Sequence, residues 1–402
     1  MEAYRLYSSL PRQTKHETVA EISLGALHRN YDLLLQAIRR TTPDVRPVCV
    51  VKADAYGHGA EVVSRALMEA GCDFFAVACL DEATALRSLL GPGPDILILG
   101  YTDPDCAAEL AANNIIQAVI SEEYMRRLAC AAEAAGVVLR VHLKLDTGMN
   151  RLGLPAQTDK AIARAAEVAA ELAASPHLRL EGMFTHFARA DEGTCRENPP
   201  AGMSGEEYTA NQFRRFMAVD SLLRERGINI PHRHVCNSAA ALRYPEYRLE
   251  MVRLGIMLYG LLPSDEVSFP GLLPVMRLRS VVSHVYDLPP GATVGYGGCF
   301  VSDMPRKIAV IPVGYADGFL RAYTGGTIKI YHDNIAYPAT VVGRVCMDQL
   351  TADITGTPCT TGDTAVLFGE EPGDLEELAH RAGTIGYESL CLISSRVPRY
   401  YV

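Results

Sequence analysis

Residues 47–78 read PVCVVKADAYGHGAEVVSRALMEAGCDFFAVA, in which two short apolar runs flank an Ala- and Glu-rich segment. The runs at 47–51 and 74–78 have the length and composition of buried β-strands, and the segment between them has high helix propensity. The same alternation continues with apolar runs at residues 95–100, 116–121, 140–146, 180–187, 232–238 and 251–260. Eight strands separated by helices favour an α/β fold with a (β/α)8 barrel, although an open doubly wound sheet has the same alternation.

A different pattern begins after the Pro-rich stretch at residues 263–274, PSDEVSFPGLLP. The chain beyond it has the pattern of short strands separated by Gly, Pro, Asp and Asn turns, and only residues 374–382 have helical periodicity. We therefore expect a tail at residues 1–16, a barrel domain at 17–267 whose first strand could instead pack on the β domain, and a mostly-β C-terminal domain at 268–402.

The composition excludes several classes of partner. The chain has 38 Lys and Arg against 47 Asp and Glu, a net charge of −9, and no basic stripe of the kind that binds nucleic acid. Its apolar runs are too short to cross a membrane, and its polar N-terminus lacks a signal-peptide core. The 11 Cys lack CxxC pairs, which favours reduced thiols over a disulfide framework or a zinc site. These features predict a cytoplasmic protein without a metal, membrane or nucleic-acid partner.

Polar residues follow several of the predicted strands, where barrel enzymes place their active sites. Lys52 follows the first strand, Lys144 and Arg151 belong to the end of the fifth, His186 follows the sixth, and Arg253 lies in the eighth. A lysine directly after an apolar strand is expected to be nearly buried, and burial lowers its pKa towards that of a nucleophilic amine. Such an amine can form a Schiff base.

A second group of residues predicts a phosphate site. Ser238 opens a predicted short helix at residues 237–242, and the N–H groups at a helix N-terminus attract anions. Gly255 allows the backbone to approach a phosphate closely, and Tyr56 completes the predicted cradle. A Schiff-base lysine beside a phosphate site indicates either pyridoxal phosphate (PLP) or an aldolase-type reaction on a phosphosugar.

Taken together, nine segments of the chain resemble alanine racemase, and they occur in that family's order across residues 19–402. The segments are VVKADAYGHG, KLDTGMNRLG, THFARAD, HVCNSAAAL, RLGIMLYG, VGYGGCF, VGYADGF, GRVCMDQ and GYESLCLISSRVPRYY. The resemblance implies PLP-dependent interconversion of L-alanine and D-alanine, which supplies D-alanine for bacterial peptidoglycan. It also implies a homodimer whose active sites are shared between the subunits.

The resemblance further implies a mechanism with two bases, one on each face of the substrate Cα. Lys52 is similar to the lysine that holds PLP and acts as one base. Tyr296 is similar to the second base, which reaches into the active site of the neighbouring subunit. His186 resembles the residue that hydrogen-bonds this tyrosine and links it to Arg253. Arg253 resembles the residue that faces the pyridine nitrogen, and an arginine there leaves that nitrogen unprotonated.

The other family positions are carried over residue by residue. The cofactor-binding set implied in this way is Lys52, Tyr56, Arg151, His186, Asn237, Ser238, Arg253, Gly255, Ile256 and Tyr387. The implied substrate-binding residues are Arg151, Met347 and Asp348. The implied entrance residues are Asp191, Tyr315, Arg321, Arg344 and Ile385. Lys144 resembles a lysine that is often carbamylated and then positions Arg151. A Pro- and Gly-rich loop at residues 191–205 is expected to border the entrance.

Three alternatives stay open at this point. The first is a racemase of serine or other small amino acids on the same scaffold. The second is a decarboxylase, which would need a glutamate against the pyridine nitrogen where this chain has Arg253. The third is a non-catalytic PLP-binding protein made of a lone barrel, which predicts neither a second domain nor Tyr296.

Overall fold

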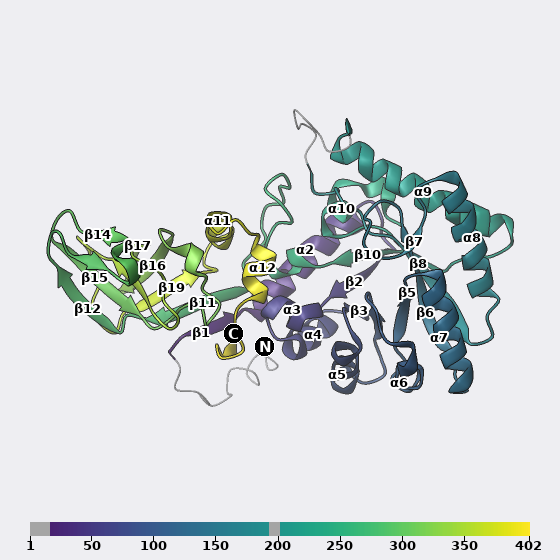
Figure 1. Ribbon diagram of the computed structural model, residues 1–402, viewed down its shortest axis with the longest axis horizontal. Coiled ribbons are helices and arrows are strands. Elements are labelled where there is room, and N and C mark those ends of the chain that lie inside the picture. The colour runs from purple at the N-terminus through teal and green to yellow at the C-terminus, as the bar shows by residue number, and fades with distance from the viewer. Residues whose placement is uncertain (1–16, 193–201) are drawn as a thin grey trace.

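Parallel strands and helices alternate through the N-terminal half of the computed structural model, which describes residues 17–192 and 202–402 (Figure 1). The predicted tail at 1–16 and residues 193–201 of the predicted loop lie outside the described residues. The barrel strands are β2 (Arg46–Val50), β3 (Phe74–Val77), β4 (Asp95–Ile98), β5 (Ile116–Val119), β6 (Leu139–Asp146), β8 (Leu178–Phe184), β9 (His232–His234) and β10 (Met251–Leu254).

These strands close on themselves, which confirms the predicted barrel and excludes the open doubly wound sheet. Neighbours pair in parallel in the order β10, β2, β3, β4, β5, β6, β8, β9. The remaining seam lies between β9 and β10, where the Arg253 N–H donates to the Cys236 carbonyl at 3.0 Å. A two-residue strand, β7 (Leu154–Pro155), pairs with the end of β6.

Helices surround this barrel, as the alternating pattern predicts. In the described residues they are α2 (Leu24–Arg39), α3 (Lys52–Gly57), α4 (Ala60–Glu69), α5 (Leu80–Leu90), α6 (Ala107–Ala112), α7 (Glu122–Ala134), α8 (Asp159–Ala173), α9 (Gly205–Glu225) and α10 (Ser238–Arg243). Several begin at a Ser or Thr whose hydroxyl accepts a backbone N–H of the first turn, as Ser121, Thr158 and Ser204 do. None of the helices in the described part of the chain is long and apolar enough to span a bilayer.

The last three barrel strands end before the apolar runs that predict them end. β8 begins two residues before the predicted 180–187 run and ends three residues before the end of that run. β9 stops at His234 and β10 stops at Leu254, although their predicted runs continue to residues 238 and 260. Gly255 leaves the extended conformation with φ −124° and ψ −111°, and a 3-10 turn, η4 (Ile256–Tyr259), follows it. The apolar run therefore continues through a buried turn, because burial alone does not distinguish a strand from a compact turn.

A second, mostly antiparallel sheet lies beside the barrel (Figure 1). Its strands are β1 (Val19–Ile22), β11 (Met276–Val281), β12 (His284–Leu288), β15 (Arg306–Ile311), β16 (Thr327–His332), β17 (Ile335–Val341), β18 (Leu350–Asp353), β19 (Thr364–Phe368) and β20 (Arg399–Tyr401). Strand β1 pairs with β11 and β20, so the first strand of the chain belongs to this sheet. A separate hairpin consists of β13 (Thr293–Val294) and β14 (Phe300–Val301).

Two helices of the C-terminal half connect this sheet to the barrel. The first, α11 (Asp374–Arg381), matches the predicted helical stretch, whereas α12 (Gly386–Cys391) was not predicted. Helix α12 packs against α3, the turn that begins with Lys52. The Arg399 guanidinium donates to the Gly57 carbonyl at 3.0 Å. One continuous apolar core runs through both halves, so the C-terminal segment supports the Lys52 turn directly.

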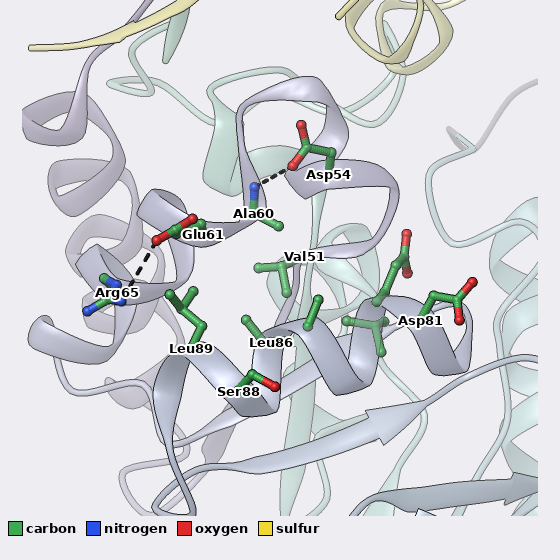
Figure 2. Close-up of a pocket in the computed structure, with 12 residues that line it drawn as sticks. Val51, Asp54, Ala60, Glu61, Arg65, Asp81, Leu86, Ser88 and Leu89 are labelled. Carbon is green, nitrogen blue, oxygen red and sulfur yellow. Dashed lines mark hydrogen bonds and ion pairs between the residues drawn. The ribbon is translucent and has the colours of Figure 1, made fainter. Parts of the chain in front are cut away.

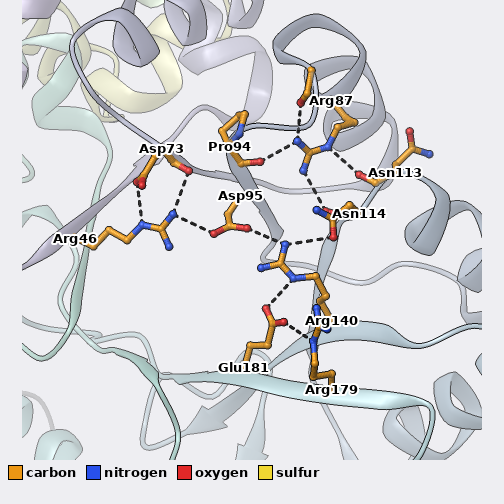
Figure 3. A network of polar contacts seen from close by, with 11 residues as sticks. Arg46, Asp73, Arg87, Pro94, Asp95, Asn113, Asn114, Arg140, Arg179 and Glu181 are labelled. Atoms are coloured by element: carbon orange, nitrogen blue, oxygen red, sulfur yellow. Dashed lines mark hydrogen bonds and ion pairs between the residues drawn. The ribbon is translucent and has the colours of Figure 1, made fainter.

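The opposite end of the barrel is closed by a network of charges (Figure 3). Arg140 in β6 lies 2.8 Å from Asp95 at the start of β4 and 2.8 Å from Glu181 in β8. Arg46 in β2 contacts the second oxygen of Asp95 at 3.0 Å. Although burial would raise it, hydrogen bonds and the charges of Arg140 and Arg46 hold the pKa of Asp95 below its usual value. This network ties together the N-terminal ends of four strands.

Replacing Arg140 with Met should therefore lower the free energy of unfolding by about 1–3 kcal/mol, because Asp95 and Glu181 then lose a partner in a largely buried place. The control is Arg126→Met, which removes an exposed pair with Glu122 on α7 and should cost less than about 1 kcal/mol. Urea unfolding at neutral pH measures both values. Equal losses in the two variants would contradict a structural role for the network.

Candidate active site

The turn after β2 has an unusual backbone. Ala53, Asp54, Ala55 and Tyr56 all have φ of 53–54° and ψ of 40–51°, so four consecutive residues form a left-handed helical turn directly after Lys52. For residues other than Gly this conformation costs roughly 1–2 kcal/mol each. Strain of this size persists only where surrounding contacts impose it, and such places are often functional.

Several contacts hold this turn. The Asp54 carboxylate accepts the Ala60 N–H at 2.7 Å (Figure 2). The His58 Nδ1 lies 3.0 Å from two carbonyl oxygens of the turn, and since carbonyls only accept, this nitrogen carries the proton. A Cβ at Gly57 would lie 2.5 Å from the Leu390 carbonyl oxygen, and one at Gly59 would overlap the Tyr401 hydroxyl. The glycines of the AYGHG segment therefore admit the C-terminal segment onto the turn.

Four cations gather at this end of the barrel. Burial and the charge of Arg151 lower the pKa of the Lys52 amine. Burial, Arg151 and Arg253 lower the pKa of Lys144, which is 4% exposed, to about 8. Burial also lowers the pKa of Arg253 to about 10. A concentration of positive charge in a chain of net charge −9 indicates a site for an anionic ligand.

Arg253 is satisfied by neutral acceptors. Its guanidinium donates to the carbonyls of Thr185 and His234 and to Nδ1 of His234, each at 2.8 Å, and to the Val235 carbonyl at 3.1 Å. His186 Nδ1 lies 3.4 Å from the same guanidinium. Burial and the neighbouring charge of Arg253 hold the pKa of His186 well below its usual value, so this imidazole is neutral. The predicted pairing of His186 with Arg253 is thus present in the geometry.

The predicted phosphate residues also come together. The ring of Tyr56 lies 6.2 Å from that of Tyr387 in α12. The Gly255 N–H donates to the Ser238 hydroxyl at 2.9 Å, and a Cβ at Gly255 would lie 2.9 Å from the Tyr56 hydroxyl. Asn237 caps α10 by accepting the Ala240 N–H, and the buried Ile256 follows Gly255 in η4. These side chains surround a small cradle whose floor has no room for a methyl group.

The predicted second base and substrate residues of the C-terminal domain lie away from the cation group around Lys52. Tyr296 lies in a short turn after β13 and is 71% exposed, and Met347 is 53% exposed. Figure 1 shows β14, which pairs with β13, at the far end of this domain from α3. One chain therefore does not bring Tyr296 to Lys52. Asp348 forms an ion pair with Arg396 at 2.8 Å.

The predicted entrance residues lie in three places. The segments of Tyr315 and Met347 lie side by side, since the Tyr315 N–H donates to the Cys346 carbonyl at 3.1 Å. Arg344 lies beside the turn of Tyr296, with its guanidinium 2.8 Å from where a Cβ of Gly297 would be. A second group lies near Tyr387, whose pKa is raised by burial and, to a smaller extent, by the charges of Tyr56 and Asp191. The exposed Ile385 occupies the N-cap position of α12, the helix that contains Tyr387. Arg321 is exposed in the turn η6 (Arg321–Tyr323).

Comparison with known proteins covers both halves of the chain. The model of the alanine racemase N-terminal domain matches residues 22–263, and that of the alanine racemase C-terminal domain matches residues 275–401. The chain belongs to the alanine racemase family. Among curated relatives, alanine racemase of Desulfovibrio desulfuricans is 39% identical over 385 residues, which cover 95% of this chain and 97% of the relative. That of Methanococcus maripaludis is 38% identical over 96% of this chain and 99% of its own.

Solved structures agree with this assignment. Alanine racemase of Clostridium difficile 630 superposes with a TM-score of 0.85 at 36% identity, covering 97% of each chain. The enzyme of Streptomyces coelicolor A3(2) gives a TM-score of 0.84 at 36% identity, covering 96% of this chain and 98% of its own. The family resemblance and the fold class inferred from the sequence are thereby confirmed.

The sequence pattern does not identify two residues that contact the site. Glu82, in the first turn of α5, contacts the Lys52 turn, but an acidic residue there is typical of any helix N-terminus and so gives no separate signal. His142, in the middle of β6, donates to or accepts from His234 at 2.9 Å. Its position inside an apolar strand was the one available signal, since a buried polar group needs a partner.

The family resemblance implies that the cradle around Gly255 holds the phosphate of PLP. Replacing Gly255 with Ala should then weaken PLP binding by tenfold or more, because the added methyl group displaces the Tyr56 hydroxyl from the cradle. Titration of the apo-protein with PLP, followed by absorbance, measures the dissociation constant. Gly93→Ala is the matched control, because a Cβ there meets no atom within 4 Å and the backbone needs no left-handed conformation. Unchanged PLP affinity in Gly255→Ala would show that the cradle residues do not bind the cofactor phosphate.

Proposed function

We propose that this chain is a PLP-dependent racemase that interconverts L-alanine and D-alanine in the cytoplasm as a homodimer. The observation that carries the proposal is the cation group of Lys52, Lys144, Arg151 and Arg253, in a chain that matches the alanine racemase family through both domains. The reaction supplies D-alanine for bacterial peptidoglycan. In the Clostridium difficile relative, a solved complex contains cycloserine.

The residues present fit the cofactor. Tyr56, Ser238, Gly255, Ile256 and Tyr387 would hold the phosphate, with Asn237 shaping the start of α10. Lys52 would hold the cofactor covalently, and Arg253 would donate to its ring nitrogen. When bound, PLP withdraws electrons from the substrate Cα and so acidifies its α-proton.

The protein must then move a proton at each face of that carbon. Burial keeps a fraction of the Lys52 amine neutral, so that it can accept the α-proton on one side. Tyr296 of the partner subunit would act on the other side, with the neutral His186 and Arg253 as its link to the barrel. Because a guanidinium retains its proton, Arg253 would donate a hydrogen bond to the ring nitrogen without protonating it. An unprotonated ring nitrogen favours proton exchange over side reactions.

The substrate carboxylate needs positive charge and a small enclosure. Arg151 lies at the barrel mouth, and Met347 and Asp348 of the partner subunit would complete the pocket. Asp191, Tyr315, Arg321, Arg344 and Ile385 would form a narrow entrance that favours a small side chain. A racemase of serine or other small amino acids is the nearest alternative, and the family match favours alanine.

The first test follows the reaction itself. Incubation of the purified holoenzyme with L-alanine in deuterated water should yield D-alanine with deuterium at Cα, because the abstracted proton exchanges with solvent. Chiral chromatography and mass spectrometry measure both products, with serine as the competing substrate. Absence of D-alanine while PLP is bound would exclude the proposal, and faster turnover of serine would favour the alternative.

The second test addresses the shared active site. Lys52→Ala and Tyr296→Phe should each lose most activity as homodimers, because each lacks one of the two bases. Mixing the two inactive variants should restore activity, since a heterodimer contains one site with both residues. Mass spectrometry of the mixture confirms subunit exchange. No recovery after exchange would show that each chain carries a complete site.

The third test concerns carbamylation of Lys144, which would turn a cation into an anion beside Arg151. In this reaction the neutral amine nitrogen attacks CO2 and loses a proton. Since the pKa of Lys144 is about 8, incorporation of 13C-labelled CO2 at fixed dissolved CO2 should rise as the pH increases through that value. Lys144→Met should lose the NMR signal and Lys160→Met, at an exposed site on α8, should keep it. A signal retained in Lys144→Met would contradict this role.

A further inference from the structure

The carboxylate of Glu82 joins the ends of two neighbouring barrel strands. One oxygen accepts the N–H of Ala53, which follows Lys52 after β2, at 2.6 Å. The other accepts the N–H of Ala78, which follows β3, at 2.7 Å. Both oxygens of this side chain are therefore used by backbone groups, and a shorter or neutral side chain cannot provide the same two acceptors.

These bonds act at the first residue of the left-handed turn. Val51, at the N-cap position of α3, makes no side-chain hydrogen bond to the turn. The first N–H groups of a helix have no partner within the helix, so the Ala53 N–H needs an acceptor from elsewhere. Glu82 supplies that acceptor from α5.

The same contact also constrains the backbone of Lys52. The Ala53 N–H belongs to the peptide unit formed with the Lys52 carbonyl, so fixing this unit fixes the backbone of Lys52 as well. The negative charge of Glu82 also raises the pKa of the Lys52 amine, against burial and the charge of Arg151, which lower it.

We propose that Glu82 is a positioning residue for Lys52, whose carboxylate holds the strained turn and thereby directs the lysine amine. The inference rests on the proposed role of Lys52 as the residue that holds PLP. Glu82 does not touch the reacting atoms; it acts through the Ala53 peptide unit.

The surroundings of Glu82 make it a testable position. It lines a cavity of about 690 Å³ between α4 and α5, together with Val51, Asp54 and Asp81 (Figure 2). Water in this cavity can replace a lost carboxylate, so removal of the side chain is expected to loosen the turn without preventing folding. Asp81 precedes Glu82 in the same helix turn and lines the same cavity, which makes Asp81→Asn a matched control.

The first experiment measures hydrogen exchange in the holoenzyme by mass spectrometry. In Glu82→Gln, peptides containing Ala53 and Ala78 should exchange about tenfold faster or more, because one acceptor becomes an amide NH2 that faces an N–H. Asp81→Asn should exchange as the wild type does. Equal protection in Glu82→Gln and the wild type would overturn the proposal. Should Glu82→Gln not fold, the wild type decides, because absence of protection at Ala53 would also overturn it.

The second experiment separates positioning from a general loss of structure. In Glu82→Gln the pH midpoint of the absorbance of the lysine-bound cofactor should move to lower pH, since a negative charge near the Lys52 nitrogen is gone. The kcat should fall by up to about 10²-fold with KM changed by less than about twofold, as expected when a reacting group is misplaced. A midpoint and kcat equal to those of Asp81→Asn would overturn the proposal. If the wild type forms no D-alanine, the proposed function fails, whereas exchange and absorbance still decide the role of Glu82.

Discussion

The buried guanidinium of Arg253 is the interaction on which the barrel and its site both depend. Its backbone N–H spans the seam between β9 and β10, and its side chain donates to carbonyls of Thr185, His234 and Val235. These carbonyls lie at the ends of β8 and β9, so one side chain holds the last three strands in register at the mouth. A buried cation that is 3% exposed requires acceptors of this kind, because each lost acceptor leaves an uncompensated donor.

The same residue orders a polar column through the barrel interior. Arginine only donates, so His234 Nδ1 accepts from Arg253, and the His234 proton lies on Nε2. That proton is donated to His142 Nδ1 at 2.9 Å. Both imidazoles are therefore neutral, in agreement with burial and nearby positive charge, which hold the pKa of His234 well below its usual value and lower that of His142 to about 3. His142 and His234 thus hold the Arg253 guanidinium in place from the barrel interior, and because both are neutral they do not offset its positive charge.

The sequence predicts the parts of this structure that depend on burial and periodicity. The strands from β2 to β6 follow apolar runs, and the β-rich half follows its turns, because both depend on local composition. The turn at residues 53–56 could not be predicted, since Ala, Asp and Tyr favour right-handed conformations. Contacts of Asp54, His58, Glu82 and the C-terminal segment, which the local sequence does not indicate, reverse this preference. Helix α12 is too short for a periodic signal and depends on packing against α3. The sequence motif thus predicts a role for Lys52, and only the structure gives the conformation of the turn that follows it.

The exposed apolar side chains of the second domain are consistent with the proposed shared active site. Large apolar side chains are normally buried, and a group of them left on the surface usually marks an interface. In the C-terminal domain such residues include Tyr296, Val301, Met304, Tyr315 and Met347. The cation group around Lys52 is suited to an anionic ligand, and under the proposed two-base mechanism the second base, Tyr296, lies far from it on the same chain. A contact between the barrel of one copy and this surface of another would bury the apolar side chains and supply that base in one step. Folding within a chain and assembly between chains would then satisfy two different requirements of the same site.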